Sequence, residues 1–203
     1  YDERCNRLAH LLRDTGLDRG DHYAVFMENN SRYLEACGAG ERTGLYYTCI
    51  NSFLTAEEVA YIISNSESQV LITSEARREV ALAAARQCPK VKLVLVVDGP
   101  GDGDDIQNLD EAVAAFPETP VANESHGGSM LYSSGTTGQP KGILRPMPDE
   151  PPEFTLPLHG FLYDLWQYRE GMIYLSPAPL YHAAPNVAVG LTLRKGGTAI
   201  IME

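Results

Sequence analysis

Helical periodicity alternates with short apolar runs along the first half of the chain. Residues 91–97, for example, are almost entirely apolar, which is typical of a buried parallel strand. Thr55 and Glu58 have the spacing of a capping box that opens a helix. Repeated strand–helix alternation predicts an α/β fold with a mostly parallel sheet and crossover helices. We expect helices over residues 2–14, 31–43, 55–65 and 74–88, and strands over 23–27, 45–50, 70–73 and 91–97.

The second half of the chain has weaker periodicity and more proline. The segment 98–110 is rich in aspartate and glycine, and we expect a solvated surface loop there. Tyr163 and Trp166 are three residues apart, a helical spacing that predicts core packing. We divide the chain at residue 117, into an α/β portion (1–116) and a second portion (117–203). In the second portion we expect a strand over 129–133, an extended segment over 143–146, helices over 158–168 and 183–193, and strands over 171–175 and 198–202.

A loop rich in hydroxyls and glycines follows the strand expected at 129–133. Glycines let a backbone approach a ligand closely, hydroxyls donate hydrogen bonds, and a lysine adds a compact positive charge. A nucleotide P-loop is excluded, because it needs four residues between its glycines and a hydroxyl after its lysine. The alternative to a phosphate-binding loop is a solvated loop whose hydroxyls only hydrogen-bond to nearby backbone groups. The candidate polyphosphate ligands are Ser133, Ser134, Gly135, Thr136, Thr137, Gly138 and Lys141.

The ordered residues from Met130 to Lys141 resemble the signature loop of the adenylate-forming (AMP-binding) superfamily. A second segment, 174–182, resembles the strand and Pro-Leu-aromatic-His turn that lies beside the acyl pocket in that family. The sequence Ser-Pro-Ala-Pro-Leu-Tyr-His-Ala-Ala-Pro is most similar to bacterial fatty-acyl-CoA synthetases. The resemblance covers nearly the whole chain, as an incomplete N-terminal domain of the adenylate-forming fold.

This resemblance implies an acid–thiol ligase that uses ATP, Mg²⁺ and coenzyme A. The carboxylic acid, a fatty acid by this resemblance, would be activated as an acyl-adenylate and then transferred to the thiol of coenzyme A. The family's adenine, ribose and magnesium motifs and its C-terminal lysine are not found in residues 1–203. We therefore expect the 203 residues to be part of a longer enzyme and to be inactive alone. Another adenylating ligase, acting on a bile acid, an aryl acid or an amino acid, remains open, as does a non-catalytic nucleotide-binding or interaction module.

His182 is the catalytic candidate, because the resemblance places it beside the substrate carboxylate, where a neutral imidazole can donate a hydrogen bond. The alternative is a packed histidine that serves only the structure. We expect His126 and His159 to be surface or loop residues. The spacing of the histidines does not indicate a metal site, and we assign no metal ligand.

Composition excludes some classes of protein. The net charge of −11 disfavours nucleic acid as the main partner. Cysteines 5, 37, 49 and 88 stand in apolar surroundings at wide spacing, which predicts buried reduced thiols in a cytoplasmic protein. We predict no transmembrane segment, since no run of 18 apolar residues is present. The sequence leaves homo-oligomer formation open.

Overall fold

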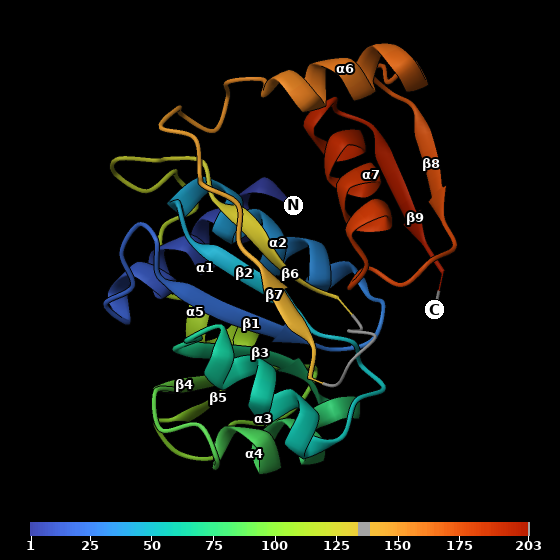
Figure 1. Cartoon of the computed structure of the whole chain (residues 1–203). Helices are drawn as coiled ribbons and strands as arrows, with labels where there is room; N and C mark the ends of the chain where they lie inside the picture. The colour runs from blue at the N-terminus through green and yellow to red at the C-terminus, as the bar shows by residue number, and fades with distance from the viewer. Residues whose placement is uncertain (134–138, 203) are drawn as a thin grey trace.

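A seven-stranded sheet forms the centre of the molecule in the computed structural model, which describes residues 1–133 and 139–202. The strand order is β5-β4-β3-β1-β2-β6-β7, and every neighbouring pair is parallel except β6 and β7. The predicted α/β fold with a mostly parallel sheet is therefore confirmed (Figure 1). The strands are β1 (His22–Phe26), β2 (Tyr46–Cys49), β3 (Val70–Ser74), β4 (Leu93–Val97), β5 (Ile106–Asn108), β6 (Gly128–Ser133) and β7 (Lys141–Ile143).

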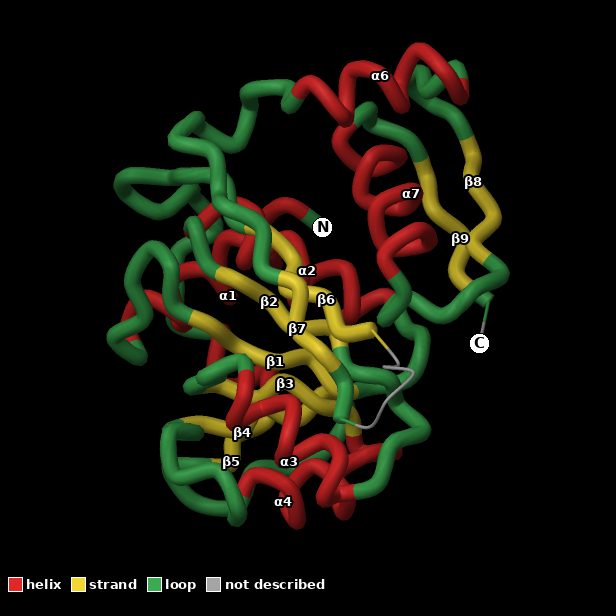
Figure 2. Tube along the Cα trace, in the orientation of Figure 1, coloured by secondary structure: helices red, strands yellow, loops and turns green. Residues whose placement is uncertain are grey.

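Helices cover both faces of this sheet (Figure 2). Alternate residues of a strand point to opposite faces, so Tyr23 and Val25 of β1 pack on one side and Ala24 and Phe26 on the other. The first side is covered by α1 (Asp2–Asp14), α2 (Ser31–Thr43) and α5 (Leu109–Val113). The second side is covered by α3 (Ala56–Asn65) and α4 (Arg78–Ala85), which a short 3-10 helix, η1 (Glu75–Arg77), precedes.

The C-terminal part of the chain forms a smaller βαβ unit on the side of α1 and α2. Strands β8 (Ile173–Ser176) and β9 (Thr198–Ile201) are parallel, and α7 (Ala183–Arg194) connects them. Leu180 and Val189 are fully buried and join the core on the α1 and α2 side of the main sheet. Helix α6 (Pro157–Trp166) lies at the outside of this unit (Figure 1).

Four local expectations were wrong. The strand after the signature loop begins at Lys141, because residues 141–143 pair with 131–133 in an antiparallel hairpin. The segment 98–110 is not all loop, since it contains β5 and the first two residues of α5. Trp166 is 53% exposed and does not pack in the core. His126 is buried rather than on the surface, and its Nε2 lies 3.0 Å from the carbonyl oxygen of Phe154.

All four cysteines are buried free thiols, as predicted. Burial raises the pKa of the Cys5 thiol to about 12 and also raises that of Cys37, so both remain protonated. None of the helices formed by residues 1–133 and 139–202 has the length and apolar character needed to cross a membrane.

Candidate functional site

The β6–β7 hairpin carries both ends of the predicted phosphate loop. Ser133 is the last residue of β6, Lys141 is the first residue of β7, and the two are partners in the antiparallel ladder. Side chains of such partners lie on the same face, with Cβ atoms roughly 5 Å apart. Both residues are exposed. A hydroxyl and an ammonium group therefore face solvent side by side, within reach of one anion.

The other predicted ligands, Ser134, Gly135, Thr136, Thr137 and Gly138, lie outside the described residues. Lys141 makes no ion pair within the part of the chain that the structure describes. Its charge is thus available to a ligand. The exposed Ser133–Lys141 pair has the donors and the positive charge that a polyphosphate requires.

The Pro179-Leu180-Tyr181-His182 turn lies at the same edge of the sheet as the hairpin. Strand β6 runs parallel to β2 and β2 parallel to β1, so the carboxyl ends of all three meet at one edge. Asn29, shortly after β1, accepts a hydrogen bond from the backbone N–H of Leu180 at 2.8 Å. Its Nδ2 donates to the carbonyl oxygens of Ala178 and Met202, at 3.2 and 2.9 Å. Ligands of open α/β sheets bind at this edge.

His182 is the residue before α7, and its side chain is exposed. Its ring lies against the ring of Tyr181, with centroids 4.5 Å apart. The ring makes no hydrogen bond to another residue of the described segments. The His182 ring is therefore at the surface of the protein and not enclosed by the core.

Asn186 fixes the same turn from within α7. Its Nδ2 donates to the carbonyl oxygen of Leu180 at 3.1 Å, and it also lies 3.4 Å from the Sγ of Cys37. Sequence reasoning missed both Asn29 and Asn186. A polar residue shortly after a buried strand, as at Asn29, was the one available signal, because such residues lie at the ligand-binding edge.

A cleft of about 200 Å³ lies beside Asn186, between α7, the start of β6 and the proline-rich segment before α6. Burial, together with the charge of Arg194, lowers the pKa of His159 in this cleft, so its imidazole is neutral at pH 7. The lining is mixed. Its apolar side chains include Met147, Leu156, Leu158, Val187 and Leu191, and its charged side chains are Glu41, Arg145 and Arg194.

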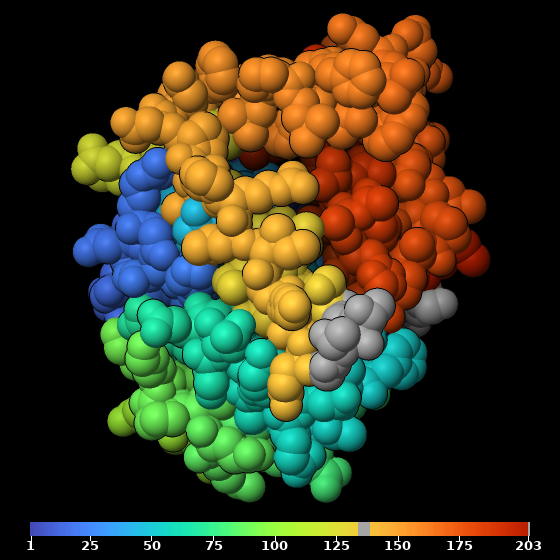
Figure 3. Space-filling view, viewed as in Figure 1, coloured from blue at the N-terminus to red at the C-terminus, as the bar shows by residue number. Residues whose placement is uncertain are grey.

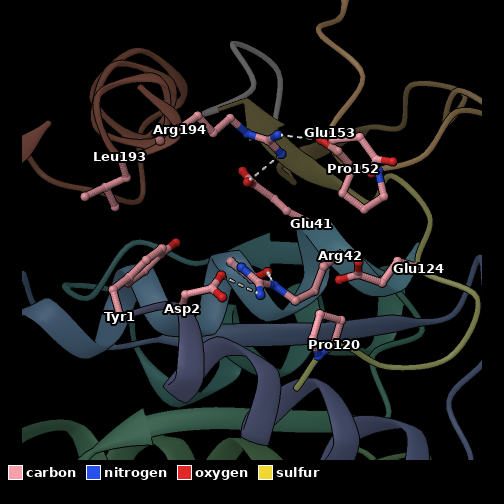
Figure 4. Close-up of a pocket in the computed structure, with 12 residues that line it drawn as sticks. Tyr1, Asp2, Glu41, Arg42, Pro120, Glu124, Pro152, Glu153, Leu193 and Arg194 are labelled. Carbon is pink, nitrogen blue, oxygen red and sulfur yellow. Dashed lines mark hydrogen bonds and ion pairs between the residues drawn. The ribbon is translucent and has the colours of Figure 1, made fainter. Parts of the chain in front are cut away.

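An adjoining cavity of about 380 Å³ lies between α2, α7 and residues 152–153 (Figure 4). Arg194 donates to Oε2 of Glu41 and to the carbonyl oxygen of Pro152, each at 2.9 Å, and so connects α7 to α2. Ser133, Lys141 and His182 line neither this cavity nor the smaller cleft. The space-filling view shows the hairpin on the surface between the α3 side of the molecule and α7 (Figure 3).

No group of three or more His, Cys, Asp or Glu side chains suited to a metal ion occurs in residues 1–133 and 139–202. A divalent ion would need further ligands, such as the phosphates of a bound nucleotide.

Comparison with protein families decides the broader identity. The family model for AMP-binding enzymes matches residues 1–203, the whole chain. The chain belongs to the AMP-binding enzyme family. The resemblance seen in the signature loop is thereby confirmed.

Curated relatives of this AMP-binding chain include two crotonobetaine/carnitine–CoA ligases. The protein of Salmonella typhimurium is 25% identical over 212 residues, which cover 99% of this chain and 39% of the relative. The protein of a Proteus species is 26% identical over 210 residues, with 98% and 39% covered. The chain thus spans about two fifths of the length of these relatives.

Solved structures agree with the fold. ATP-bound MatB from Rhodopseudomonas palustris has a TM-score of 0.73 and 26% identity, over 100% of this chain and 39% of that chain. The inhibitor-bound N-terminal domain of FACL13 from Mycobacterium tuberculosis has a TM-score of 0.80 and 25% identity, over 98% and 48%. The anthranilate CoA ligase AuaEII has a TM-score of 0.82, but at 20% identity, over 100% and 39%, it supports the fold alone.

Proposed function

We propose that the complete protein is an acid–thiol ligase that activates a carboxylic acid with ATP and transfers the acyl group to coenzyme A. The observation that supports this most directly is the Ser133–Lys141 pair at the carboxyl edge of the sheet. Membership of the AMP-binding enzyme family and the CoA-ligase relatives favour the same reaction.

In the first step, a carboxylate oxygen of the acid attacks the α-phosphorus of ATP, and the bond to the β-phosphate oxygen breaks. The products are acyl-adenylate and pyrophosphate. Ser133 and Lys141 would hold the departing phosphates by hydrogen bonding and charge, with Ser134, Gly135, Thr136, Thr137 and Gly138 completing the loop. Fixed donors of this kind stabilise the negative charge that develops on the leaving group. A bound Mg²⁺ would neutralise part of the phosphate charge.

His182 would bind and orient the carboxylate of the acid. Its exposed ring and the two asparagines that fix its turn, Asn29 and Asn186, support this role. In the second step, the thiolate of coenzyme A attacks the acyl carbon and AMP leaves.

A fatty acid is our proposed substrate. The similarity of the His182 segment to fatty-acyl-CoA synthetases supports it. The relatives named for crotonobetaine and carnitine indicate other acids that should be tried.

Acid-dependent ATP–pyrophosphate exchange tests the proposal. The complete protein should exchange labelled pyrophosphate into ATP only when its acid is present. A panel of fatty, bile, aryl and amino acids, together with crotonobetaine and carnitine, identifies the class. Binding of ATP without exchange for any of these acids would instead indicate the non-catalytic nucleotide-binding module.

A further inference from the structure

Helix α3 contacts both sides of the base of the signature-loop hairpin. The hydroxyl of Tyr61 donates a hydrogen bond to the carbonyl oxygen of Pro140 at 3.1 Å. The hydroxyl of Tyr132 donates to Oδ1 of Asn65 at 2.6 Å. Tyr61 and Asn65 are four residues apart and therefore lie on one face of the helix. One helix face thus holds the strand that enters the loop and the strand that leaves it.

Each anchored residue directly precedes a candidate phosphate ligand. Tyr132 precedes Ser133, and Pro140 precedes Lys141. Pro140 has no backbone N–H, so it cannot donate a hydrogen bond to the ladder. The hydrogen bond that Tyr61 donates to the carbonyl oxygen of Pro140 therefore restrains the backbone at the end of the ladder.

Helix α3 is a rigid support for these contacts. Its first turn carries a complete capping box between Thr55 and Glu58, and Val59 and Ile63 are buried beneath it. The ring of Tyr132 packs against the core on the same side of the sheet. Burial raises the pKa of the Tyr132 hydroxyl to about 12, so this group remains a hydrogen-bond donor across the physiological pH range.

The hairpin itself is closely packed. A Cβ added at Gly142, which is opposite Tyr132, would meet Cε of Met130 and lie only 3.1 Å from the Tyr132 ring. Strand β7 therefore has little room to slide along β6. Movement of the hairpin would have to occur where its strands join the loop, at Tyr132 and Pro140. Tyr61 and Asn65 act at that point.

We infer that Tyr61 and Asn65 are positioning residues that hold Ser133 and Lys141 in register for the β- and γ-phosphates of ATP. This rests on the proposed function, because it assigns those two residues to the phosphates. Neither Tyr61 nor Asn65 contacts the nucleotide in this proposal. Placement of donors matters because small displacements of binding groups reduce rates strongly.

The experiment compares Tyr61→Phe with wild type in the complete protein. It measures the KM for ATP and the rate of ATP–pyrophosphate exchange, together with thioester formation from preformed acyl-adenylate. We expect a fall in exchange of about three- to tenfold with a higher KM for ATP, as for the loss of one hydrogen bond. Thioester formation should be unchanged, because pyrophosphate has already left.

A double-mutant cycle tests the second anchor. Asn65→Ala and Tyr132→Phe remove the same hydrogen bond from its two sides, so the double variant should lose no more exchange activity than either single variant. Losses that multiply would show that the two residues act independently and would overturn the role given to Asn65.

Tyr23→Phe is the matched control, since Tyr23 also donates to a backbone carbonyl, that of Ala36, but in the core. The Tyr23→Phe variant should have a lower melting temperature. The ratio of its rates of ATP–pyrophosphate exchange and thioester formation, measured per folded molecule, should match that of wild type. A Tyr61→Phe variant that behaves in this way, or that matches wild type in both assays, overturns the inference.

Affinity for ATP separates this inference from the proposed function. If wild type shows no exchange with any acid, the ligase activity fails, yet calorimetry with ATP still tests the anchors. Equal affinity in wild type and Tyr61→Phe would then overturn the inference, and weaker binding by the variant would support it. A wild-type protein that binds neither ATP nor pyrophosphate would overturn both.

Discussion

Ser133 and Lys141 are partners across the β6–β7 hairpin, and both side chains are exposed. Parallel pairing of β6 with β2 places the pair at the carboxyl edge of the sheet. At the same edge, Asn29 binds the turn that carries His182. Two segments about fifty residues apart in the sequence are thus brought to one edge of the sheet.

Lys141→Ala should slow adenylation and leave thioester formation from preformed acyl-adenylate unchanged. The lost charge-assisted contact corresponds to about 1.5–3 kcal/mol of transition-state stabilisation. ATP–pyrophosphate exchange measures the first half-reaction. Lys92→Ala is the control, because Lys92 is exposed and precedes β4 at the opposite edge of the sheet. Equal losses in both half-reactions would contradict a role limited to the loop.

His182→Ala should impair use of the acid, raising its KM or lowering the rate that depends on it, while the affinity for ATP stays nearly constant. Its side chain is exposed, so the melting temperature should change little. Kinetics at varied acid and varied ATP, with a thermal melt, provide the measurement. A destabilised variant with normal kinetics per folded molecule would instead assign His182 a structural role.

His22 should make the free energy of unfolding depend on pH. Burial lowers the pKa of His22 in the folded protein, although Asp21 and Glu67 act to raise it. Below the unfolded pKa of about 6.5, the unfolded chain then binds more protons. Stability should be fully present above that pH and fall as the pH drops toward the folded pKa.

His22→Phe tests this pH dependence while keeping an aromatic ring stacked on Tyr46, where the two rings are 4.8 Å apart. Urea unfolding at about pH 5 and about pH 8 gives the free energies. The variant should lose less stability on acidification than wild type does. The same loss in both proteins would assign the acid sensitivity to other groups.

The elements that could be predicted are those with a strong local pattern. The helix over residues 2–14 and the capping box at Thr55 appear as expected, because amphipathic periodicity and capping are local properties of a sequence. Strand β5 and helix α5 were missed because the aspartates and glycines around them are typical of a loop. Pairing of β5 with β4 and capping of α5 by Asn108 outweigh that composition.

The candidate site could be proposed from the sequence only where a motif carries it. Ser133, Lys141 and His182 were proposed because the residues around them resemble motifs of a family. Asn29, Asn186, Tyr61 and Asn65 were not, because their contacts are distant in the sequence. The separations are 67 positions for Asn65 and Tyr132 and 79 for Tyr61 and Pro140. They are 149 for Asn186 and Cys37 and 173 for Asn29 and Met202. Such contacts exist only once the sheet has brought the segments together.

Asn29→Ala should weaken use of the acid and destabilise the protein. The variant removes the hydrogen bonds to Leu180, Ala178 and Met202, which fix the His182 turn against the end of β1. The loss of partly buried hydrogen bonds predicts a fall of about 1–3 kcal/mol in the free energy of unfolding. We also expect a higher KM for the acid, because His182 would no longer be held in position.

Asn30→Ala is the matched control, since the neighbouring Asn30 caps α2 by accepting from the backbone N–H of Tyr33 at 3.1 Å. Loss of this cap should cost about 1 kcal/mol of stability. Because Asn30 does not bond to the turn, the KM for the acid should match that of wild type at a temperature where both proteins are folded. If the two variants lose stability alike and neither alters the KM for the acid, Asn29 is only a structural residue and does not position His182.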